Sequence, residues 1–363
     1  MRIIKYFSEN YRNLEKTELE PCENINIFYG ENGQGKTNIL ESIWLLTGCH
    51  SFRTNKYGEL IKKGEKSAEI SLDFFARGYE QHEVLNIGTA REFTLNEIKK
   101  RSTRDVLSEF QAVVFSPLSL SCVSGGPSER RKFLNIAVSL IRPAYAGELM
   151  RYIKIMQNRN ALLKQISQGQ ADIETLDIWD GELSVSGGRL TKTRNDYIKR
   201  LSVSASQIYS EISGGKEILS LSYSGALNGE DADKNEYSED IFSKLKKNRE
   251  LDIKRLSTCA GPHRDDIIIS INGMNIRGYG SQGQQRSAAL ALKIAEAYII
   301  KEESGESPVI LLDDVMSELD LNRQRALLKY LSGWQVFVSC CDPLNLSAAS
   351  NCKLFKVRDG RIF

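Results

Sequence analysis

The sequence predicts an α/β fold assembled from both ends of the chain, with a mostly helical segment inserted between the two parts. Three observations support this prediction. A glycine-rich loop at residues 30–37 follows a strand-like run and opens a helix-like one. Near the C-terminus, a hydrophobic strand ends in the carboxylates of Asp313 and Asp314. Between these two features, residues 128–213 show a helical pattern almost throughout.

The composition is that of a folded protein with balanced charge. The chain has 363 residues, of which 41% are hydrophobic, and its 49 basic and 47 acidic side chains give a net charge of +2. This much apolar material excludes a wholly disordered chain, and a prior of about 150 residues per domain predicts two or three domains or lobes. The balanced charge argues against a uniformly basic surface for nucleic acid, although it permits local basic patches.

No segment has the character of a targeting or membrane-spanning sequence. Residues 1–11 are too polar for a signal peptide. No stretch approaches the roughly 20 apolar residues that a spanning helix needs. The seven cysteines show neither a CxxC pair nor metal-ligand spacing, and there are only three histidines. We therefore expect reduced cysteines, a cytoplasmic location and no membrane partner.

The two ends of the chain alternate between strand-like and helix-like runs. In the first part, a helix is expected over 39–46, and the expected strands are 25–29, 68–75, 81–87 and 111–115. In the last part, a long Ala- and Leu-rich helix is expected over 287–300, and the expected strands are 267–271, 309–312 and 336–338. Alternating strands and helices of this kind favour an α/β architecture.

The middle of the chain has the spacing of paired helices. The residues at 149, 153, 156, 160 and 163 fall at alternating steps of four and three, and all of them are apolar except Asn160. A second apolar series from 183 to 197 repeats every seven residues. Two helices joined by residues 167–172 would form an antiparallel hairpin. It is either a short projecting arm or part of a compact subdomain, because Gly187 and Gly188 interrupt the second series.

These patterns divide the chain into a head made of two parts and an inserted lobe. Residues 1–118 and 257–363 are assigned to the head. Residues 119–256 are assigned to the lobe, which comprises the helical hairpin and a mixed segment with an exposed acidic loop at 228–240.

The strongest local motif is Gly30-Glu31-Asn32-Gly33-Gln34-Gly35-Lys36-Thr37. It matches the phosphate-binding pattern G-x-x-x-x-G-K-[ST] and stands between a strand and a helix, as that loop does. Backbone N–H groups of the loop would surround the phosphates of ATP, and the helix N-terminus adds a partial positive charge. Lys36 would reach the β- and γ-phosphates, and the hydroxyl of Thr37 would bind Mg²⁺. The alternative is a strand-to-helix turn that simply needs flexible glycines.

A second motif, Val309-Ile310-Leu311-Leu312-Asp313-Asp314, places two carboxylates after a hydrophobic strand. Ligands of parallel α/β sheets bind at the carboxyl ends of the strands, so this pair is expected on the magnesium side of a nucleotide site. Asp313 would hold Mg²⁺, and Asp314 would orient or deprotonate the attacking water. Asp314 and Lys36 are thus the expected catalytic residues. Alternatively, the pair caps a helix that starts near Asp320.

A third motif, Gly280-Ser281-Gln282-Gly283-Gln284-Gln285-Arg286, immediately precedes the long helix. It resembles the signature loop of ABC-type ATPases, which binds the γ-phosphate of a nucleotide held by a second protomer. Its position 30 residues before the acidic pair strengthens that interpretation. The alternative is an ordinary helix N-cap, for which Ser281 is well suited.

Together these motifs resemble the ABC-type ATPase heads of the SMC and Rad50 group, and most closely the RecF family. The resemblance covers essentially the whole chain. It also rests on Asn10-Tyr11-Arg12-Asn13, Ser51-Phe52-Arg53-Thr54, Phe115-Ser116-Pro117 and residues 126–134, 157–163, 261–266 and 317–320.

The resemblance implies an ATP-dependent DNA-binding ATPase that acts in DNA repair, recombination and replication and in the SOS response. Two protomers would close on ATP and Mg²⁺ into a homodimer on duplex and single-stranded DNA at gaps, and weak DNA-dependent hydrolysis would release them. RecR and RecO are implied as partners, with RecA as the indirect beneficiary. Arg12 joins residues 30–37 as nucleotide-binding, while Ser281, Gly283 and Gln284 would complete the site of the partner protomer.

Two positions depart from the general ABC pattern. Asp314 stands where that pattern has glutamate, and the shorter side chain predicts slow hydrolysis. Ser339-Cys340-Cys341-Asp342 stands where the switch histidine is expected, so the γ-phosphate sensor is not assigned. Gln111 is the candidate for the glutamine of the Q-loop, which links Mg²⁺ and the γ-phosphate.

Four basic clusters could contact DNA phosphates: 62–63, 99–104, 130–132 and 244–249. Basic and aromatic residues do not interleave in the manner of base-reading surfaces, so DNA binding is implied mainly by the resemblance and would be led by phosphate contacts.

Two other functions are left open. One is a transporter-type ABC ATPase, whose heads lack a helical insertion of this size. The other is a clamp that binds ATP without hydrolysing it.

Overall fold

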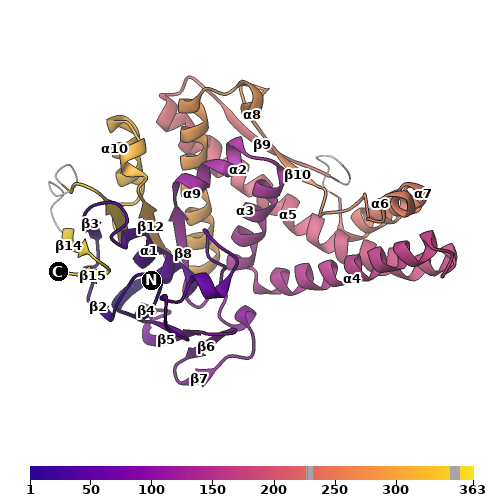
Figure 1. Cartoon of the computed structure of the whole chain (residues 1–363). Coiled ribbons are helices and arrows are strands. Elements are labelled where there is room, and N and C mark those ends of the chain that lie inside the picture. Colours follow the sequence, from indigo (N-terminus) through magenta and orange to yellow (C-terminus); the bar gives the residue numbers. More distant parts are fainter. Residues whose placement is uncertain (226, 228–231, 344–351) are drawn as a thin grey trace.

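A computed structural model describes residues 1–225, 227, 232–343 and 352–363 of the chain. In this described part, the strands form three sheets, and the central one has the order β15-β14-β3-β13-β12-β8 (Figure 1). Its strands are β3 (Ile25–Tyr29), β8 (Ala112–Phe115), β12 (Val309–Asp313), β13 (Val336–Cys340), β14 (Cys352–Arg358) and β15 (Arg361–Ile362). All neighbours are parallel except β14 and β15.

The central sheet joins the two ends of the chain, as expected. Strand β3 lies between β13 and β14, so that Ile25 is paired with both Val336 and Cys352. Strands β8, β12 and β13 are buried along their whole length, which explains their continuous hydrophobic runs. The α/β fold assembled from both chain ends is thereby confirmed.

The second sheet is antiparallel and comes entirely from the first 99 residues, in the order β2-β1-β4-β5-β6-β7. Its strands are β1 (Arg2–Glu9), β2 (Thr17–Leu19), β4 (Ala68–Ala76), β5 (Tyr79–Ile87), β6 (Arg91–Leu95) and β7 (Ile98–Lys99). Helix α1 (Lys36–Leu45) contacts strands of both sheets. Eight of its residues are buried, because it fills the space between two apolar sheet faces.

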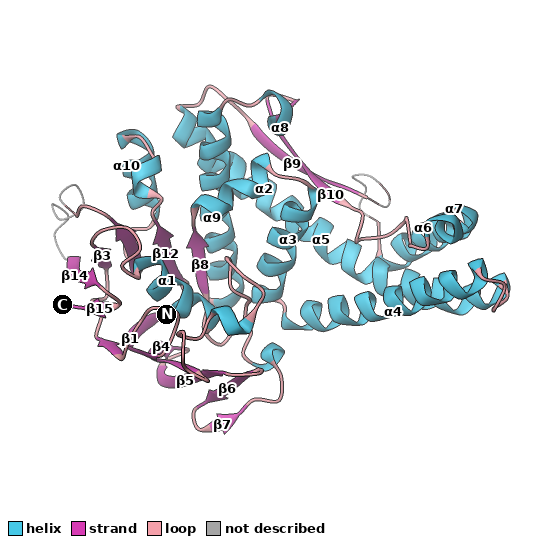
Figure 2. Cartoon of the chain, in the orientation of Figure 1, coloured by secondary structure: helices cyan, strands magenta, loops and turns pink. Residues whose placement is uncertain are grey.

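The remaining helices are α2 (Ser121–Ser124), α3 (Pro127–Ile141), α4 (Pro143–Ser167), α5 (Leu176–Ser213), α6 (Lys234–Lys247), α7 (Arg249–Arg255), α8 (Ile276–Tyr279), α9 (Gln282–Ser304) and α10 (Leu321–Tyr330). Helices α4 and α5 form the expected hairpin, and Figure 2 shows α4, α6 and α7 extending away from the central sheet. The third sheet joins β9 (Leu219–Ser224) to β10 (Asp266–Ile271) and β11 (Met274–Asn275), and so bridges the assigned boundary at residue 256. The division into head and lobe stays a prediction.

One expectation about the middle of the chain, the exposed loop at 228–240, was wrong in part. Gly187 and Gly188 interrupt the hydrophobic series but not the helix, because α5 runs through them and α6 packs closely against them. A Cβ on Gly188 would lie 2.6 Å from the carbonyl oxygen of Lys234. The expected acidic loop at 228–240 is helical from residue 234 onward, while residues 228–231 lie outside the described part. A capping box starts α6, since Asp233 accepts hydrogen bonds from the backbone N–H groups of residues 235 and 236.

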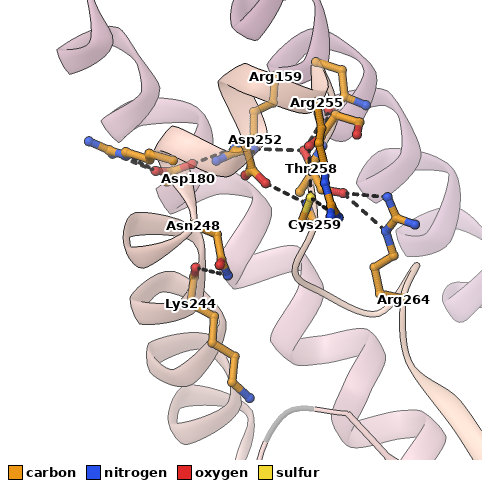
Figure 3. A network of polar contacts seen from close by, with 12 residues as sticks. Arg159, Asp180, Lys244, Asn248, Asp252, Arg255, Thr258, Cys259 and Arg264 are labelled. Atoms are coloured by element: carbon orange, nitrogen blue, oxygen red, sulfur yellow. Dashed lines mark hydrogen bonds and ion pairs between the residues drawn. The ribbon is translucent and has the colours of Figure 1, made fainter.

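A buried ionic network holds the projecting helices together (Figure 3). The side chain of Arg159, on α4, is 0% exposed and donates hydrogen bonds to Asp180 (2.7 Å), Asp252 (2.7 Å) and Thr258 (2.9 Å). These partners lie on α5, on α7 and in the segment that leads to β10. Such a network fixes three elements relative to one another, because a charge left unpaired there would be costly.

None of the seven cysteines forms a disulfide in the structure. Within the described residues, no helix combines the length and the apolar character that crossing a bilayer requires.

Candidate nucleotide-binding site

The phosphate-loop motif forms the turn between β3 and α1. Gly30 and Gly35 have φ angles of 148° and 116°, which favour glycine. A Cβ on Gly30 would also lie 2.4 Å from the carbonyl oxygen of Val357 on β14. The ammonium of Lys36 folds back over the loop and donates hydrogen bonds to the carbonyls of Gly30 (2.6 Å) and Glu31 (2.8 Å). The loop is therefore shaped by steric requirements that local sequence alone only suggests.

The acidic strand brings its first carboxylate against the start of α1. The hydroxyl of Thr37 donates a 2.7 Å hydrogen bond to Oδ1 of Asp313, and the hydroxyl of Ser339 donates one of 2.9 Å to the same oxygen. Asp313 is 6% exposed. Burial raises the pKa of its carboxyl group, the two hydroxyl hydrogen bonds oppose this effect, and the nearby charge of Asp314 adds to it.

This donor set fits Mg²⁺. A carboxylate and a hydroxyl are oxygen ligands of the type that Mg²⁺ prefers, and a cation beside Asp313 would stabilise the charge that burial disfavours. Among the described residues there is no cluster of three or more His, Cys, Asp or Glu side chains suited to a metal ion. Mg²⁺ held by Thr37 and Asp313 would accordingly need phosphate oxygens or water as further ligands.

Asp314 follows the last residue of β12 and lines the cavity beside the phosphate loop. Its φ of 56° is unusual for a residue other than glycine, and its backbone N–H donates a 2.9 Å hydrogen bond to the hydroxyl of Ser339. The alternative that the acidic pair caps the next helix is wrong. Asp320 caps α10 instead, by accepting a 3.0 Å hydrogen bond from the backbone N–H of Arg323.

A cavity of about 510 Å³ opens between the phosphate loop and the end of β12. Asn32, Gly33, Gly35, Lys36, Thr37, Asp314 and Ser339 contribute to its lining. Four cationic side chains also line it, those of Arg12, Lys36, Arg53 and Lys63. The volume suits a small ligand, and the excess of positive charge suits an anionic one. Gln34 turns elsewhere, since its side chain accepts a 2.6 Å hydrogen bond from the backbone N–H of Asp359.

The signature-like loop lies apart from this cavity. Ser281, Gly283 and Gln284 line a different cavity, of about 350 Å³. Ser281 is the N-cap of α9 and exchanges two hydrogen bonds with Gln284, of 3.2 Å and 2.8 Å. Ser281 therefore does act as a helix N-cap, and this is compatible with a second role of the loop in binding a partner's nucleotide. Arg323 donates a 3.2 Å hydrogen bond to the carbonyl of Gly283 and so links this loop to α10.

The interpretation of Gln111 as the Q-loop glutamine was wrong. Gln111 stands before β8, and its carbonyl accepts a 3.0 Å hydrogen bond from the N–H of Val309 at the start of β12. It therefore lies at the opposite end of the sheet from Asp313. Its side-chain amide donates a 3.1 Å hydrogen bond to the carbonyl of Leu140 instead. A strand of only four residues made the two ends hard to tell apart in the sequence.

The comparisons with known proteins agree on one family. The family model described as "RecF/RecN/SMC N terminal domain" matches residues 2–362. The DNA replication and repair protein RecF of Caldanaerobacter subterraneus subsp. tengcongensis is 41% identical over 366 residues, which cover 99% of each chain. The chain belongs to the RecF family. The RecF protein of Acetivibrio thermocellus is 36% identical and covers 94% of each chain.

Solved RecF structures share the fold. A structure of the recombination mediator protein RecF-ATPrS in the RecFOR pathway has a TM-score of 0.92 and 40% sequence identity, and it covers 99% of this chain and 97% of that chain. The Smc head domain of Pyrococcus furiosus, at a TM-score of 0.55 and 16% identity, shares the ABC-type head fold. The resemblance inferred from the motifs is thus confirmed, and RecF belongs to the ATP-binding ABC ATPase family.

Two residues around the site, Ser339 and Glu41, were not assigned a role there by any sequence motif. Ser339 bridges the two acidic residues, and its only signal was its place at the end of a strand in the segment that lacks a histidine. Glu41, Ser51 and Arg53 form a polar cluster with Arg12 beside the cavity. Nothing local in the sequence points to Glu41, because its partners lie 29 and 10 residues away.

The structure pairs two arginines of the basic clusters with carboxylates of the same chain. The side chain of Arg130 is 6% exposed and donates two hydrogen bonds to Asp266, of 2.7 Å and 2.8 Å. Arg249 is paired with Asp177 and Asp180. Both arginines are paired with carboxylates of the same chain, so neither is a free cation at the surface.

Proposed function

We propose that this chain is an ATP-dependent DNA-binding ATPase that dimerises on ATP and acts in recombinational gap repair and the SOS response. The observation that carries the proposal is the meeting of Lys36, Thr37 and Asp313 at one edge of the central sheet. A phosphate loop, a hydroxyl and a buried carboxylate are the parts that phosphoryl transfer from Mg²⁺·ATP requires.

Each residue has a distinct role in the proposed reaction. The N–H groups of residues 30–35 and the ammonium of Lys36 bind the phosphates and stabilise the charge that develops on them. Thr37 and Asp313 would hold Mg²⁺, which supplies charge neutralisation at the β- and γ-phosphates. Asp314 orients the attacking water and accepts its proton. Aspartate is one methylene shorter than glutamate, so hydrolysis should be slow.

The separation of the two cavities supports the proposed dimerisation. Ser281, Gly283 and Gln284 do not line the cavity that contains Lys36 of their own chain. If they bind a γ-phosphate, that phosphate belongs to a second copy, and a two-fold axis makes the arrangement reciprocal. ATP would then act as the link between protomers.

The DNA-related part of the proposal rests on family membership. The relatives are named for DNA replication and repair, and the solved RecF structures for recombination mediation in the RecFOR pathway. We therefore propose duplex and single-stranded DNA at gaps as the substrate, RecR and RecO as partners, and RecA loading as the outcome. Phosphate-led contacts would tolerate any sequence.

Sedimentation velocity with ATP, ADP or no nucleotide, each with and without duplex DNA, tests the proposal. Dimer mass is expected only with ATP, and that dimer should sediment with DNA. The Lys36→Met variant should stay monomeric in every condition. A dimer that forms equally without nucleotide, or an ATP-bound dimer that does not bind DNA, would contradict the proposal.

A non-hydrolysing ATP-dependent clamp is the second candidate, and the shorter Asp314 favours it. Single-turnover phosphate release separates the two functions. The ATPase predicts slow release that Asp314→Asn suppresses, whereas the clamp predicts no release from either protein.

A further inference from the structure

Helix α1 carries a buried carboxylate that the chemistry proposed above does not use. Glu41 is 0% exposed. The guanidinium of Arg12 donates two hydrogen bonds to it, from Nε to Oε2 (2.5 Å) and from Nη2 to Oε1 (2.8 Å). The hydroxyl of Ser51 donates a third, of 2.5 Å, to Oε1. A buried glutamate with this many donors is held in one orientation, and it holds its partners in return.

The first partner, Arg12, adopts a backbone conformation that needs outside support. Its φ of 52° lies in the left-handed region, which is unfavourable for a side chain with a Cβ. Its backbone N–H donates to the carbonyl of Leu60 (2.8 Å), and its Nη1 donates to the carbonyl of Glu59 (3.2 Å). Burial opposes the charge of Arg12, but the hydrogen bonds and the charge of Glu41 raise its pKa above the ordinary value.

The second partner, Ser51, connects Glu41 to the backbone of Arg53. The oxygen of the Ser51 hydroxyl accepts hydrogen bonds from the backbone N–H groups of Arg53 (2.9 Å) and Thr54 (3.0 Å), and so fixes that turn. Nη1 of Arg53 also lies 3.7 Å from Oε2 of Glu41. Both arginines line the 510 Å³ cavity together with Lys36, whereas Glu41 does not.

We propose that Glu41 is a positioning residue of the nucleotide site, which directs the guanidinium groups of Arg12 and Arg53 toward the phosphates of bound ATP. The proposal rests on the proposed ATP-binding function. Glu41 itself does not touch the nucleotide. It fixes the guanidinium of Arg12 by hydrogen bonds, and its charge attracts that of Arg53, which Asn38 holds by a 2.7 Å hydrogen bond. Less entropy is then lost when ATP binds.

Glu41→Gln tests the proposal with the smallest change of shape. The amide cannot accept both guanidinium hydrogen bonds and has no charge, so the equilibrium affinity for ATP should fall by about tenfold or more. KM for ATP should rise by a similar factor, while kcat changes less. Glu83→Gln is the matched control. Glu83 is also 0% exposed, but it lies on β5 and neither of its carboxylate oxygens has a hydrogen-bond partner. ATP affinity should not change in that variant.

A double-mutant cycle separates positioning from general stability. In the Arg12→Ala/Arg53→Ala background, Glu41→Gln should cost less than about twofold in ATP affinity, because its targets are gone. An equal loss with and without the two arginines would overturn the proposal. So would wild-type ATP affinity in Glu41→Gln.

A second variant keeps the proposal testable if Glu41→Gln does not fold. Arg12→Lys keeps the charge but not the two-pronged contact, and it should lose ATP affinity to a similar degree. Normal affinity in Arg12→Lys would overturn the proposal. Absence of ATP binding in the wild-type protein would instead refute the proposed function, so the two failures are distinguishable.

Discussion

The hydroxyl of Thr37 and the carboxylate of Asp313 are 2.7 Å apart, although 276 residues separate them in the chain. Strand β13 lies between the strands that precede these two residues, and it contributes Ser339 to the same carboxylate. The parallel register of the central sheet therefore brings three distant segments to one edge. This meeting is the physical basis for proposing a Mg²⁺·ATP site here.

Replacement of Lys36 by methionine tests the phosphate loop. Methionine has a similar length but no charge and no donor, so phosphate oxygens lose a charge-assisted hydrogen bond worth about 1.5–3 kcal/mol. We expect ATP affinity to fall by about tenfold or more and hydrolysis to be lost. Equilibrium binding of a fluorescent ATP analogue measures this. Wild-type affinity would refute the assignment of Lys36.

Asp314→Asn tests the catalytic carboxylate. The amide keeps the size and polarity of the side chain but cannot accept a proton, so ATP should bind normally while hydrolysis falls. The ATP-bound dimer should then persist on DNA. Phosphate release and dimer lifetime measure the two effects. If hydrolysis continued at the wild-type rate, the base would have to be another group.

Ser281→Arg tests whether the signature loop acts on the partner's nucleotide. The long charged side chain would block a close backbone approach between protomers, while the cavity around Lys36 is untouched. Monomer affinity for ATP should be near normal, and dimerisation and hydrolysis should fail. Loss of monomer ATP binding would place the loop in its own chain's site.

Mixing Ser281→Arg with Lys36→Met provides the complementary experiment. One composite site of the mixed dimer then carries both defects and the other carries none. Partial recovery of ATPase activity is expected, provided that one intact site suffices. No recovery at any mixing ratio would argue against action in trans.

The salt dependence of DNA binding tests whether phosphate contacts dominate. Affinity for duplex DNA should fall with a log–log slope of about −0.9 for each phosphate neutralised. Binding should be tighter with ATP, because a dimer presents two basic surfaces at once. Fluorescence anisotropy over a salt series measures both effects. A flat salt dependence or a strong preference for one sequence would contradict phosphate-led binding.

Glu83 predicts an unusual pH dependence of stability. Burial, with a smaller contribution from Glu109, raises the pKa of its carboxyl group well above 4.5. Between the unfolded and folded pKa values the native state binds one more proton than the unfolded state, so stability falls as pH rises. The slope for one proton is about 1.4 kcal/mol per pH unit.

Glu83→Gln removes this titration and should flatten the pH dependence, with the gain in stability growing as the pH rises above the ordinary glutamate pKa of 4.5. Urea unfolding midpoints over a pH series measure the change. Parallel curves for the two proteins would show that Glu83 does not govern this slope.

The sequence by itself determined the elements with a strong local signal. The phosphate loop, the acidic strand, the helical hairpin and four strands of the central sheet, β3, β8, β12 and β13, were predicted correctly, and the motifs together identified the family. Strands β14 and β15 were not predicted. Each of the predicted features depends on side-chain periodicity or on motifs of fewer than ten residues, which are properties of neighbours in the chain. The glycines at positions 30 and 35 belong to that motif, whereas their positive φ angles and the close approach of Val357 to Gly30 are seen only in the structure.

Only the tertiary structure decided which of these residues meet. In the structure, Gln111 lies at the wrong end of the sheet for a Q-loop, Arg130 is buried and paired with Asp266, and Glu41 accepts hydrogen bonds from Arg12. The separations are 136 residues for Arg130 and Asp266 and 29 for Glu41 and Arg12. Neither pair shares a repeat or a motif in the sequence. Their contacts follow from strand order, register and the packing of α1 between two sheets, which are decided by burial across the whole chain rather than by any local pattern.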